Sequence, residues 1–398
     1  MAEGVLSAAS GNKSRTVFFN MPNVIDLKQT SDVRDAILRA VETLAAGKLI
    51  AVPTETVYGI AASALNETAV QRLSELKERS DEKPWSFAIK SVDDALDYVP
   101  DMTLLQRRLA RRSWPGPATY VFDIHADSVV HRLPEIVKKP MVKRGTIGLR
   151  VPAHEITLEI LRLCAGPLVL TSANLNGQAD ATDGQQVVDE LGDRVDLVLN
   201  DGVSRLGQPS SVIKLSEGGF EFLREGVVDQ STLDSLSNLM IVIVCTGNTC
   251  RSPMGEALMR ERIAEKIGVE AKELEANGVV VASAGIAAMP GSLASPQSCE
   301  VMNSMGIDID HHCSQPVTPH LIQFADLILT MTDGHRQALV NHWPSAASRT
   351  FTLRRDKRDI SDPIGMPVAQ YQDCARQIDE NLKLWIEELV SKGMIGNG

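Results

Sequence analysis

The stretch MIVIVCTGNTCRSPMGEALMRERI, residues 240–263, decides the fold of the second half of this chain. It begins with five apolar residues, which indicate a strand buried on both faces of a parallel sheet. Its later part predicts a helix, because Ser252 can act as the N-cap, Pro253 suits the first helical position, and apolar residues follow at helical spacing. Residues 245–251 must then join the carboxyl end of a strand to the amino end of a helix.

Such a loop is suited to bind an anion, because backbone N–H groups point into it and the helix dipole adds partial positive charge. Gly247 permits positive φ and close backbone approach, and Asn248 tolerates the left-handed conformation better than most residues. Arg251 offers a planar fork that matches two phosphate oxygens. The sequence therefore predicts a phosphate-binding loop.

Cys245 lies at the floor of the predicted loop, where the positive surroundings favour a nucleophilic thiolate at neutral pH. Ser252 could hydrogen-bond to that thiolate. A buried structural thiol beside a surface arginine is the alternative, but it would not require the strand and the loop residues together. We expect five residues to line the phosphate: Thr246, Gly247, Asn248, Thr249 and Cys250.

These residues resemble the low-molecular-weight protein phosphatase family. The similarity continues through residues 283–285, 306–312 and 325–331. The resemblance implies a Rossmann-like parallel sheet with helices on both faces, a cysteinyl-phosphate intermediate on Cys245, and no cofactor. It also implies that Asp362, which precedes Pro363, protonates the leaving atom and then acts as general base, with Arg251 and Ser252 completing the catalytic group.

Thr249 bears on the phosphorylated residue that is cleaved. Relatives that act on phosphotyrosine usually carry an apolar residue there, whereas those that act on phosphoarginine tend to carry threonine. The acid loop around Asp362 also lacks the tyrosines that flank aromatic substrates in many members. We therefore favour phosphoarginine, and phosphotyrosine is the alternative.

Motifs of a different kind occupy the first half of the chain. An amphipathic pattern from Asp32 to Leu44 predicts a helix ended by Gly47. Beyond it, apolar strand-like segments end in polar groups, which is where binding and catalytic residues tend to lie. The motifs PTETVYG (53–59), GLRVP (148–152) and TSAN (171–174) stand at strand ends, whereas WPGPAT (114–119) is a turn that leads into a strand and PSSVIK (209–214) places two hydroxyls at a strand start.

Together with a Lys77-x-Arg79 pair and a closing LREGVV, these segments resemble the YrdC-like threonylcarbamoyl-AMP synthase family over about residues 31–228. The resemblance implies a twisted mixed sheet with helices. It also implies condensation of L-threonine, bicarbonate and ATP, with Mg²⁺ shared by the triphosphate, for the threonylcarbamoyladenosine modification of tRNA. The ATP contacts would be Lys77, Arg79, Ser172, Asn174 and Ser211. The threonine contacts would be Thr54, Arg150, Thr119 and Thr171, with Arg150 taking the carboxylate.

The motif around the cationic pair departs from the family at two positions. Ser80 follows Arg79 where proline is common, and Trp85 replaces a small aliphatic residue. The alternative reading is therefore a phosphotyrosine phosphatase that carries a non-catalytic nucleotide- or RNA-binding module. Basic clusters at residues 107–112 and 138–144 are more typical of solvated faces and give RNA contact only weak support.

The composition is that of a soluble protein with two or three domains over 398 residues, 43% of them hydrophobic and 23% charged. The net charge of −11 argues against a bulk polyanion binder. The chain shows neither an apolar run of membrane-spanning length nor a signal peptide, so we expect a cytoplasmic protein without membrane contact. Expected domains are an extension (1–30), a synthase-like domain (31–228), a linker (229–239) and a phosphatase domain (240–398).

The cysteines lack the spacing of a disulfide framework or a metal site, so we expect free thiols and no bound metal. Cys245 and Cys250 could form a reversible disulfide if the loop geometry permits. Arsenate reduction on the same fold would need closely spaced cysteines, and Cys299 and Cys313 are 14 residues apart. The six cysteines are Cys164, Cys245, Cys250, Cys299, Cys313 and Cys374.

Overall fold

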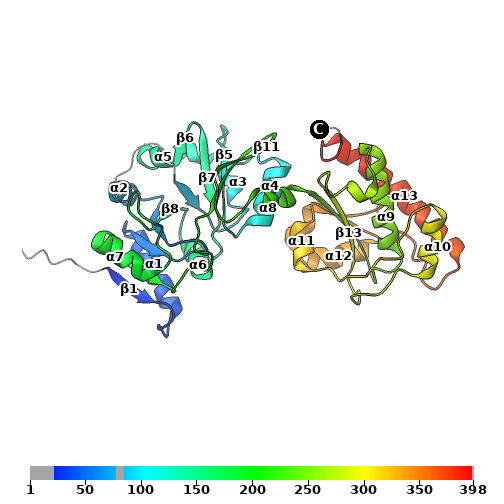
Figure 1. The fold of residues 1–398 in the computed structure, drawn as a ribbon, viewed down its shortest axis with the longest axis horizontal. Helices are drawn as coiled ribbons and strands as arrows, with labels where there is room; N and C mark the ends of the chain where they lie inside the picture. The colour runs from blue at the N-terminus through cyan, green and yellow to red at the C-terminus, as the bar shows by residue number, and fades with distance from the viewer. Residues whose placement is uncertain (1–21, 78–84, 397–398) are drawn as a thin grey trace, which may run out of the picture. The chain divides into compact units, whose positions relative to one another are not determined.

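The computed structural model describes residues 22–77 and 85–396, which divide into two compact units (Figure 1). Unit 1 contains the chain up to residue 101 together with Trp114–Val227. Unit 2 contains Met102–Ser113 and the chain from Val228 onward.

Unit 1 is built on a mixed sheet, as predicted. Within the described residues it has 11 strands, in the order β1-β9-β2-β3-β8-β4-β7-β5-β10-β11, with β6 paired to β7. The strands are β1 (Asn23–Asp26), β2 (Ile50–Val52), β3 (Gly59–Ser63), β4 (Ser86–Ala88), β5 (Ala118–Asp123), β6 (Val142–Lys143), β7 (Thr146–Arg150), β8 (Leu168–Ser172), β9 (Leu197–Asn200), β10 (Ser211–Ser216) and β11 (Gly219–Arg224). The helices are α1 (Val33–Ala45), α2 (Glu67–Leu76), α3 (Ala95–Tyr98), α5 (Glu135–Met141), α6 (Glu155–Leu163) and α7 (Gly184–Leu191), with short 3₁₀ helices η1 (Val129–Arg132) and η2 (Gly192–Arg194).

The start of unit 1 confirms one prediction and corrects another. Helix α1 forms where its pattern predicts, since Asp32 caps it by accepting from the N–H of Asp35, and Gly47 follows it with a φ of 74°. The expected extension over residues 1–30, however, contains β1, which pairs in parallel with β9. Ile25 of β1 is 9% exposed, because its side chain joins the apolar cluster beneath α1.

Unit 2 has the predicted parallel sheet, in the order β13-β12-β14-β15. Its strands are β12 (Leu239–Cys245), β13 (Val279–Gly285), β14 (Leu327–Thr330) and β15 (Thr350–Thr352). Its helices are α4 (Leu104–Ser113), α8 (Gln230–Ser237), α9 (Arg251–Ile267), α10 (Pro296–Ser304), α11 (Pro319–Phe324), α12 (Asp333–His342) and α13 (Val368–Ser391), with 3₁₀ helices η3 (Ala271–Glu273) and η4 (Pro344–Arg349).

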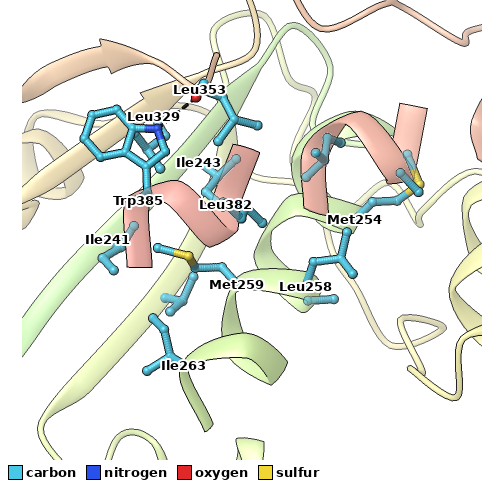
Figure 2. Packing of buried hydrophobic residues seen from close by; sticks show 14 of the residues in the cluster. Ile241, Ile243, Met254, Leu258, Met259, Ile263, Leu329, Leu353, Leu382 and Trp385 are labelled. Carbon is cyan, nitrogen blue, oxygen red and sulfur yellow. Dashed lines mark hydrogen bonds between the residues drawn. The ribbon is translucent and has the colours of Figure 1, made fainter. Parts of the chain in front are cut away.

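Alternate residues of β12 face two separate apolar clusters, which explains why this strand is apolar throughout. Ile241 and Ile243 lie in one cluster with α9 and α13. Figure 2 shows these two residues together with Leu258 of α9 and Leu382 of α13. On the other face, Val242 and Val244 join a cluster with residues of α11, α12 and η4. The central strand is therefore fixed from both sides, and with it the position of Cys245 at its end.

Residues 229–239, which we expected to be a linker without apolar periodicity, contain regular structure. They form α8, because Asp229 caps the helix by accepting from the N–H of Thr232 at 2.8 Å and Leu233 is fully buried. Strand β12 then begins at Leu239.

Helix α4 also belongs to unit 2, and three of its four arginines pair with a carboxylate of that unit, whereas Arg107 is exposed. The guanidinium groups of Arg108, Arg111 and Arg112 lie 2.8 to 2.9 Å from the carboxylate of Asp326. Burial lowers the pKa of Arg112 to about 10, and Asp326 opposes that shift. This cluster is therefore an internal ion-pair network, and it lends no support to RNA contact at residues 107–112.

Candidate active sites

The phosphate loop of unit 2 has the predicted position between β12 and α9. Cys245 ends the strand and is 3% exposed. Its sulfur accepts a hydrogen bond from the backbone N–H of Asn248 at 3.2 Å and lies 3.0 Å from the hydroxyl oxygen of Ser252. The backbone N–H of Asn248 and the hydroxyl of Ser252 therefore both contact the sulfur of the predicted nucleophile.

The conformational demands of the loop fall on residues other than Gly247. Asn248 adopts the left-handed conformation, with a φ of 55°, as its residue type allows, whereas Gly247 has no positive φ. A Cβ added at Gly285, the neighbour of Cys245 on β13, would lie 2.5 Å from the carbonyl oxygen of Thr246. The close approach of the two backbones therefore requires glycine at position 285. This steric demand explains why the segment 283–285 ends in glycine.

Ser252 does not cap the helix, contrary to our expectation. Helix α9 begins at Arg251 with Cys250 in the N-cap position, and no side chain accepts a hydrogen bond there. Ser252 instead turns its hydroxyl toward the sulfur of Cys245. The first N–H groups of α9 are therefore not satisfied by a side-chain cap, which suits a helix end that receives an anion.

Arg251 and Asp362 meet at the mouth of this loop. The guanidinium of Arg251 donates to the carboxylate of Asp362 at 2.5 Å. It also contacts the carbonyl of Ile360, which lies 109 residues further along the sequence. The side chain of Arg251 is 5% exposed and that of Asp362 is 44% exposed. The fixed arginine and the accessible acid thus lie on the same site as Cys245 and Ser252.

The side chains of Thr246, Thr249 and Cys250 each contact a neighbour. Thr246 lies 2.9 Å from the Nε2 of His335, and the hydroxyl of Thr249 lies 3.7 Å from the sulfur of Cys250. Cys250 is buried and lies 3.6 Å from the hydroxyl of Tyr371. The loop is therefore supported by α12 and α13.

His335 and Tyr371 are functional neighbours that sequence reasoning missed. Burial, and then the charge of Arg251, lower the pKa of His335 to about 4, so its imidazole is neutral at physiological pH. Burial raises the pKa of Tyr371. His312, by contrast, lies in a segment that carried the resemblance, and its Nε2 is 2.8 Å from the carbonyl of Asn248.

In unit 1 the structure brings together three of the five expected ATP contacts. The ammonium of Lys77 donates to the carbonyls of Ser172 and Asn174 at 3.1 and 2.6 Å, and to the Oδ1 of Asn174 at 3.0 Å. The hydroxyl of Ser172 donates to the same Oδ1 at 2.7 Å. Arg79 and Ser80 lie outside the described residues.

Arg150, expected to bind the carboxylate of threonine, is already paired. Its guanidinium donates to the carboxylate of Glu55 and to the hydroxyl of Thr56, both at 2.8 Å. Thr54 is 2% exposed and donates to the carbonyl of Val57 at 2.6 Å. A substrate carboxylate would therefore have to share Arg150 with Glu55.

The remaining predicted residues of unit 1 lie at strand ends. The hydroxyl of Thr119 on β5 lies 3.0 Å from that of Ser210, and Ser211 next to it is fully buried at the start of β10. Arg224, which we did not predict, donates to the carbonyl of Ser210 at 2.6 Å. Thr171 pairs with Ile60 across β8 and β3.

The other cysteines offer little to support an arsenate reductase. All six cysteines are free thiols. Burial, and then Asp310, raise the pKa of Cys299, which makes it a poorer nucleophile. Burial raises the pKa of Cys374 to about 12. In the part of the chain that the structure describes, no three His, Cys, Asp or Glu side chains are grouped to hold a metal ion, and no helix has the length and apolarity to cross a membrane.

Comparison with known families gives two matches that divide the chain. The Sua5/YciO/YrdC family model, which carries the description "Telomere recombination", matches residues 42–226. The model for "Low molecular weight phosphotyrosine protein phosphatase" matches residues 240–394.

Curated proteins repeat this division. The threonylcarbamoyl-AMP synthase of Pyrococcus abyssi is 36% identical over 45% of this chain, and the chain covers 51% of that protein, about half of its length. The threonylcarbamoyl-AMP synthase of Mus musculus is 33% identical over 51% of this chain and 71% of that protein. A protein of Ralstonia nicotianae, named as a probable low molecular weight protein-tyrosine-phosphatase, is 34% identical over 38% of this chain and 97% of its own.

Proposed function

Since this chain belongs both to the Sua5/YciO/YrdC family and to the low molecular weight phosphatase family, we propose that it is a bifunctional enzyme. Unit 1 forms threonylcarbamoyl-AMP and pyrophosphate from L-threonine, bicarbonate and ATP. Unit 2 removes phosphate from a phosphoprotein through a cysteinyl-phosphate intermediate.

The observation that carries the phosphatase assignment is the convergence of donors on Cys245. The thiolate attacks the phosphorus, while the loop N–H groups and Arg251 hold the phosphate oxygens. Because the incoming phosphate competes for the guanidinium of Arg251, it also releases Asp362 from its ion pair. Asp362 then protonates the leaving atom and later deprotonates the water that cleaves the thiophosphate bond.

The grouping of Lys77 with Ser172 and Asn174 supports the synthase assignment. A fixed ammonium beside hydroxyl and amide groups suits the phosphates of ATP, and attack on the α-phosphate depends mainly on positioning and charge stabilisation. The described residues of this region supply no cluster of carboxylates. Mg²⁺ would enter bound to the triphosphate of ATP.

The synthase assignment is tested by pyrophosphate release from ATP with the purified full-length protein. We expect release that requires both L-threonine and bicarbonate and that falls at least tenfold in Lys77→Ala. Release independent of threonine, or none at all, would favour the alternative of a non-catalytic nucleotide- or RNA-binding module. Trp85 does not by itself favour the module, because its side chain is only 4% exposed and fills the core beside β4.

For the phosphatase we propose phosphoarginine as the substrate residue, with phosphotyrosine as the alternative. Thr249 is half-buried in the loop, where its hydroxyl could bond a polar guanidinium. Ile364 and Met366 in the acid loop are 68% and 50% exposed, so that loop presents aliphatic rather than aromatic side chains next to Asp362. Neither feature provides an aromatic wall for a tyrosine ring.

Matched phosphoarginine and phosphotyrosine peptides test this preference with the wild type, Thr249→Ile and Cys245→Ser. We expect faster hydrolysis of phosphoarginine, and a weakened or reversed preference in Thr249→Ile. A wild-type preference for phosphotyrosine would refute the arginine assignment and leave the phosphatase intact. Activity retained by Cys245→Ser would refute the cysteine mechanism itself.

The cellular setting follows from the proposed chemistry. We place the protein in the cytoplasm, where its products would pass to the proteins that transfer the threonylcarbamoyl group to tRNA. Fractionation of cells that express the tagged protein, together with measurement of threonylcarbamoyladenosine in tRNA after its depletion, tests both statements. Recovery of the protein outside the cytoplasmic fraction would contradict the location, and unchanged levels of the modified nucleoside in a strain without another synthase would contradict the role in tRNA modification.

A further inference from the structure

Glu256 lies on α9, outside the phosphate loop, and no step of the reaction above uses it. Its carboxylate accepts from the hydroxyl of Ser283 at 2.6 Å, and the oxygen of Ser283 accepts from the amide nitrogen of Asn248 at 2.8 Å. The same amide nitrogen donates to Ser252 at 2.9 Å, and Ser252 lies 3.0 Å from the sulfur of Cys245. A continuous chain of hydrogen bonds therefore joins this carboxylate to the nucleophile.

The direction of each bond in this chain is fixed by the side-chain amide of Asn248. The backbone N–H of Gln315 can only donate, and it donates to the Oδ1 of Asn248 at 2.8 Å. The Nδ2 must then be the donor to both serines, which leaves each serine one proton of its own to place. The proton of Ser283 goes to Glu256, and that of Ser252 goes to the sulfur of Cys245 at 3.0 Å, which is nearer than its other acceptor, the carbonyl oxygen of Ala284 at 3.5 Å.

This series of hydrogen bonds also holds Asn248, the residue of the loop with a left-handed backbone, in place. Asn248 has a φ of 55° and is fully buried, and its backbone N–H is the second donor to Cys245. Ser283 is 1% exposed, so without Glu256 its hydroxyl would be a buried donor without its present acceptor. We expect Ser283 to turn in that case and to release the amide of Asn248.

We propose that Glu256 is a positioning residue for the phosphatase reaction, which acts through Ser283 and Asn248 to aim two donors at the thiolate of Cys245. A direct effect of its charge would have the opposite sign. A carboxylate near a thiolate disfavours the anion through space, so its removal alone would make the thiolate form at lower pH. Loss of the two donors would make it form at higher pH.

The test is the pH dependence of the rate at which iodoacetamide abolishes hydrolysis of an aryl phosphate. We expect the midpoint of this profile to rise by about one pH unit in Glu256→Ala, since a hydrogen bond to a charged group is worth roughly that much. Glu256→Gln should stay near the wild type, because its carbonyl can still accept from Ser283. Glu261→Ala, which removes a carboxylate from the same helix outside the chain of bonds, should leave the midpoint unchanged.

The same substitution made in a Ser283→Ala protein shows whether Glu256 acts through Ser283. Ser283→Ala should raise the midpoint by itself, and Glu256→Ala should add nothing further to it. An unchanged or lowered midpoint in Glu256→Ala, or an equal rise in both backgrounds, would overturn the proposal. If Glu256→Ala does not fold, an unchanged midpoint in Ser283→Ala overturns it instead. The readout is independent of whether the natural substrate is phosphoarginine or phosphotyrosine.

Discussion

The imidazole of His335 makes the stability of unit 2 depend on pH. Burial and Arg251 lower its pKa from 6.5 to about 4, whereas Asp359 and Asp362 oppose this shift. Between these values the unfolded chain binds a proton that the folded chain does not, so the contribution of His335 to stability is complete above pH 6.5 and is lost as the pH falls toward 4. In this window the slope approaches about 1.4 kcal/mol per pH unit.

We therefore expect His335→Gln to flatten the loss of stability between pH 7 and pH 5. Urea unfolding of unit 2 at several pH values, followed by the fluorescence of buried Trp385, measures this dependence. The carboxylates whose pKa is lowered, such as Asp379, lose their contribution at lower pH and do not enter this window. Equal slopes for wild type and variant would show that His335 is not kept neutral by the fold.

The residues that sequence could identify are those whose roles are local. Cys245, Asn248 and Arg251 follow from a strand, a turn and a helix start within a few positions. Glu256, His335 and Tyr371 could not be identified in this way, because their contacts to Ser283, Thr246 and Cys250 join positions 27, 89 and 121 residues apart. The position of Ser252 was misread as a cap because the anion loop leaves the helix end uncapped by side chains.

At the scale of elements, α4 is held to α11 and β14 by the ion pairs of Asp326. This carboxylate is 8% exposed and faces three arginines. Its removal would leave their charges buried and uncompensated, so we expect Asp326→Ala to cost about 3 to 5 kcal/mol in the free energy of unfolding of unit 2. Asp373→Ala breaks an exposed pair with Arg376, and its cost should stay below about 1 kcal/mol.

Denaturant unfolding of both variants checks this difference. Equal small losses would mean that solvent reaches the arginines once the carboxylate is gone. The sequence contains no local signal for these ion pairs, because Arg112 and Asp326 lie 214 residues apart.

Elements with a strong hydrophobic pattern were predictable from the sequence, and elements with a weak pattern were not. The apolar run of residues 240–244 and the amphipathic pattern of residues 32–44 identified β12 and α1 within a few residues of their bounds. Helix α8 was missed because it has eight residues and a single buried side chain, Leu233. Strand β1 was missed because its four residues alternate only weakly, and its partner β9 is distant in sequence.

At the scale of the whole molecule, the two sets of proposed site residues lie in separate compact units, and the contacts that position each set lie within its own unit. The bonds of Lys77 end on Ser172 and Asn174, and those of Cys245 end on Asn248 and Ser252. Because neither set needs a residue of the other, a substitution in one should leave the other site intact.

We therefore expect Cys245→Ser to abolish dephosphorylation while pyrophosphate release continues at the wild-type rate, and Lys77→Ala to do the reverse. Both rates are measured on one preparation of each full-length variant, with kcat and KM determined separately. A change of more than about twofold in the untouched activity would show that the two reactions are coupled. Loss of neither activity would instead favour a non-enzymatic scaffold.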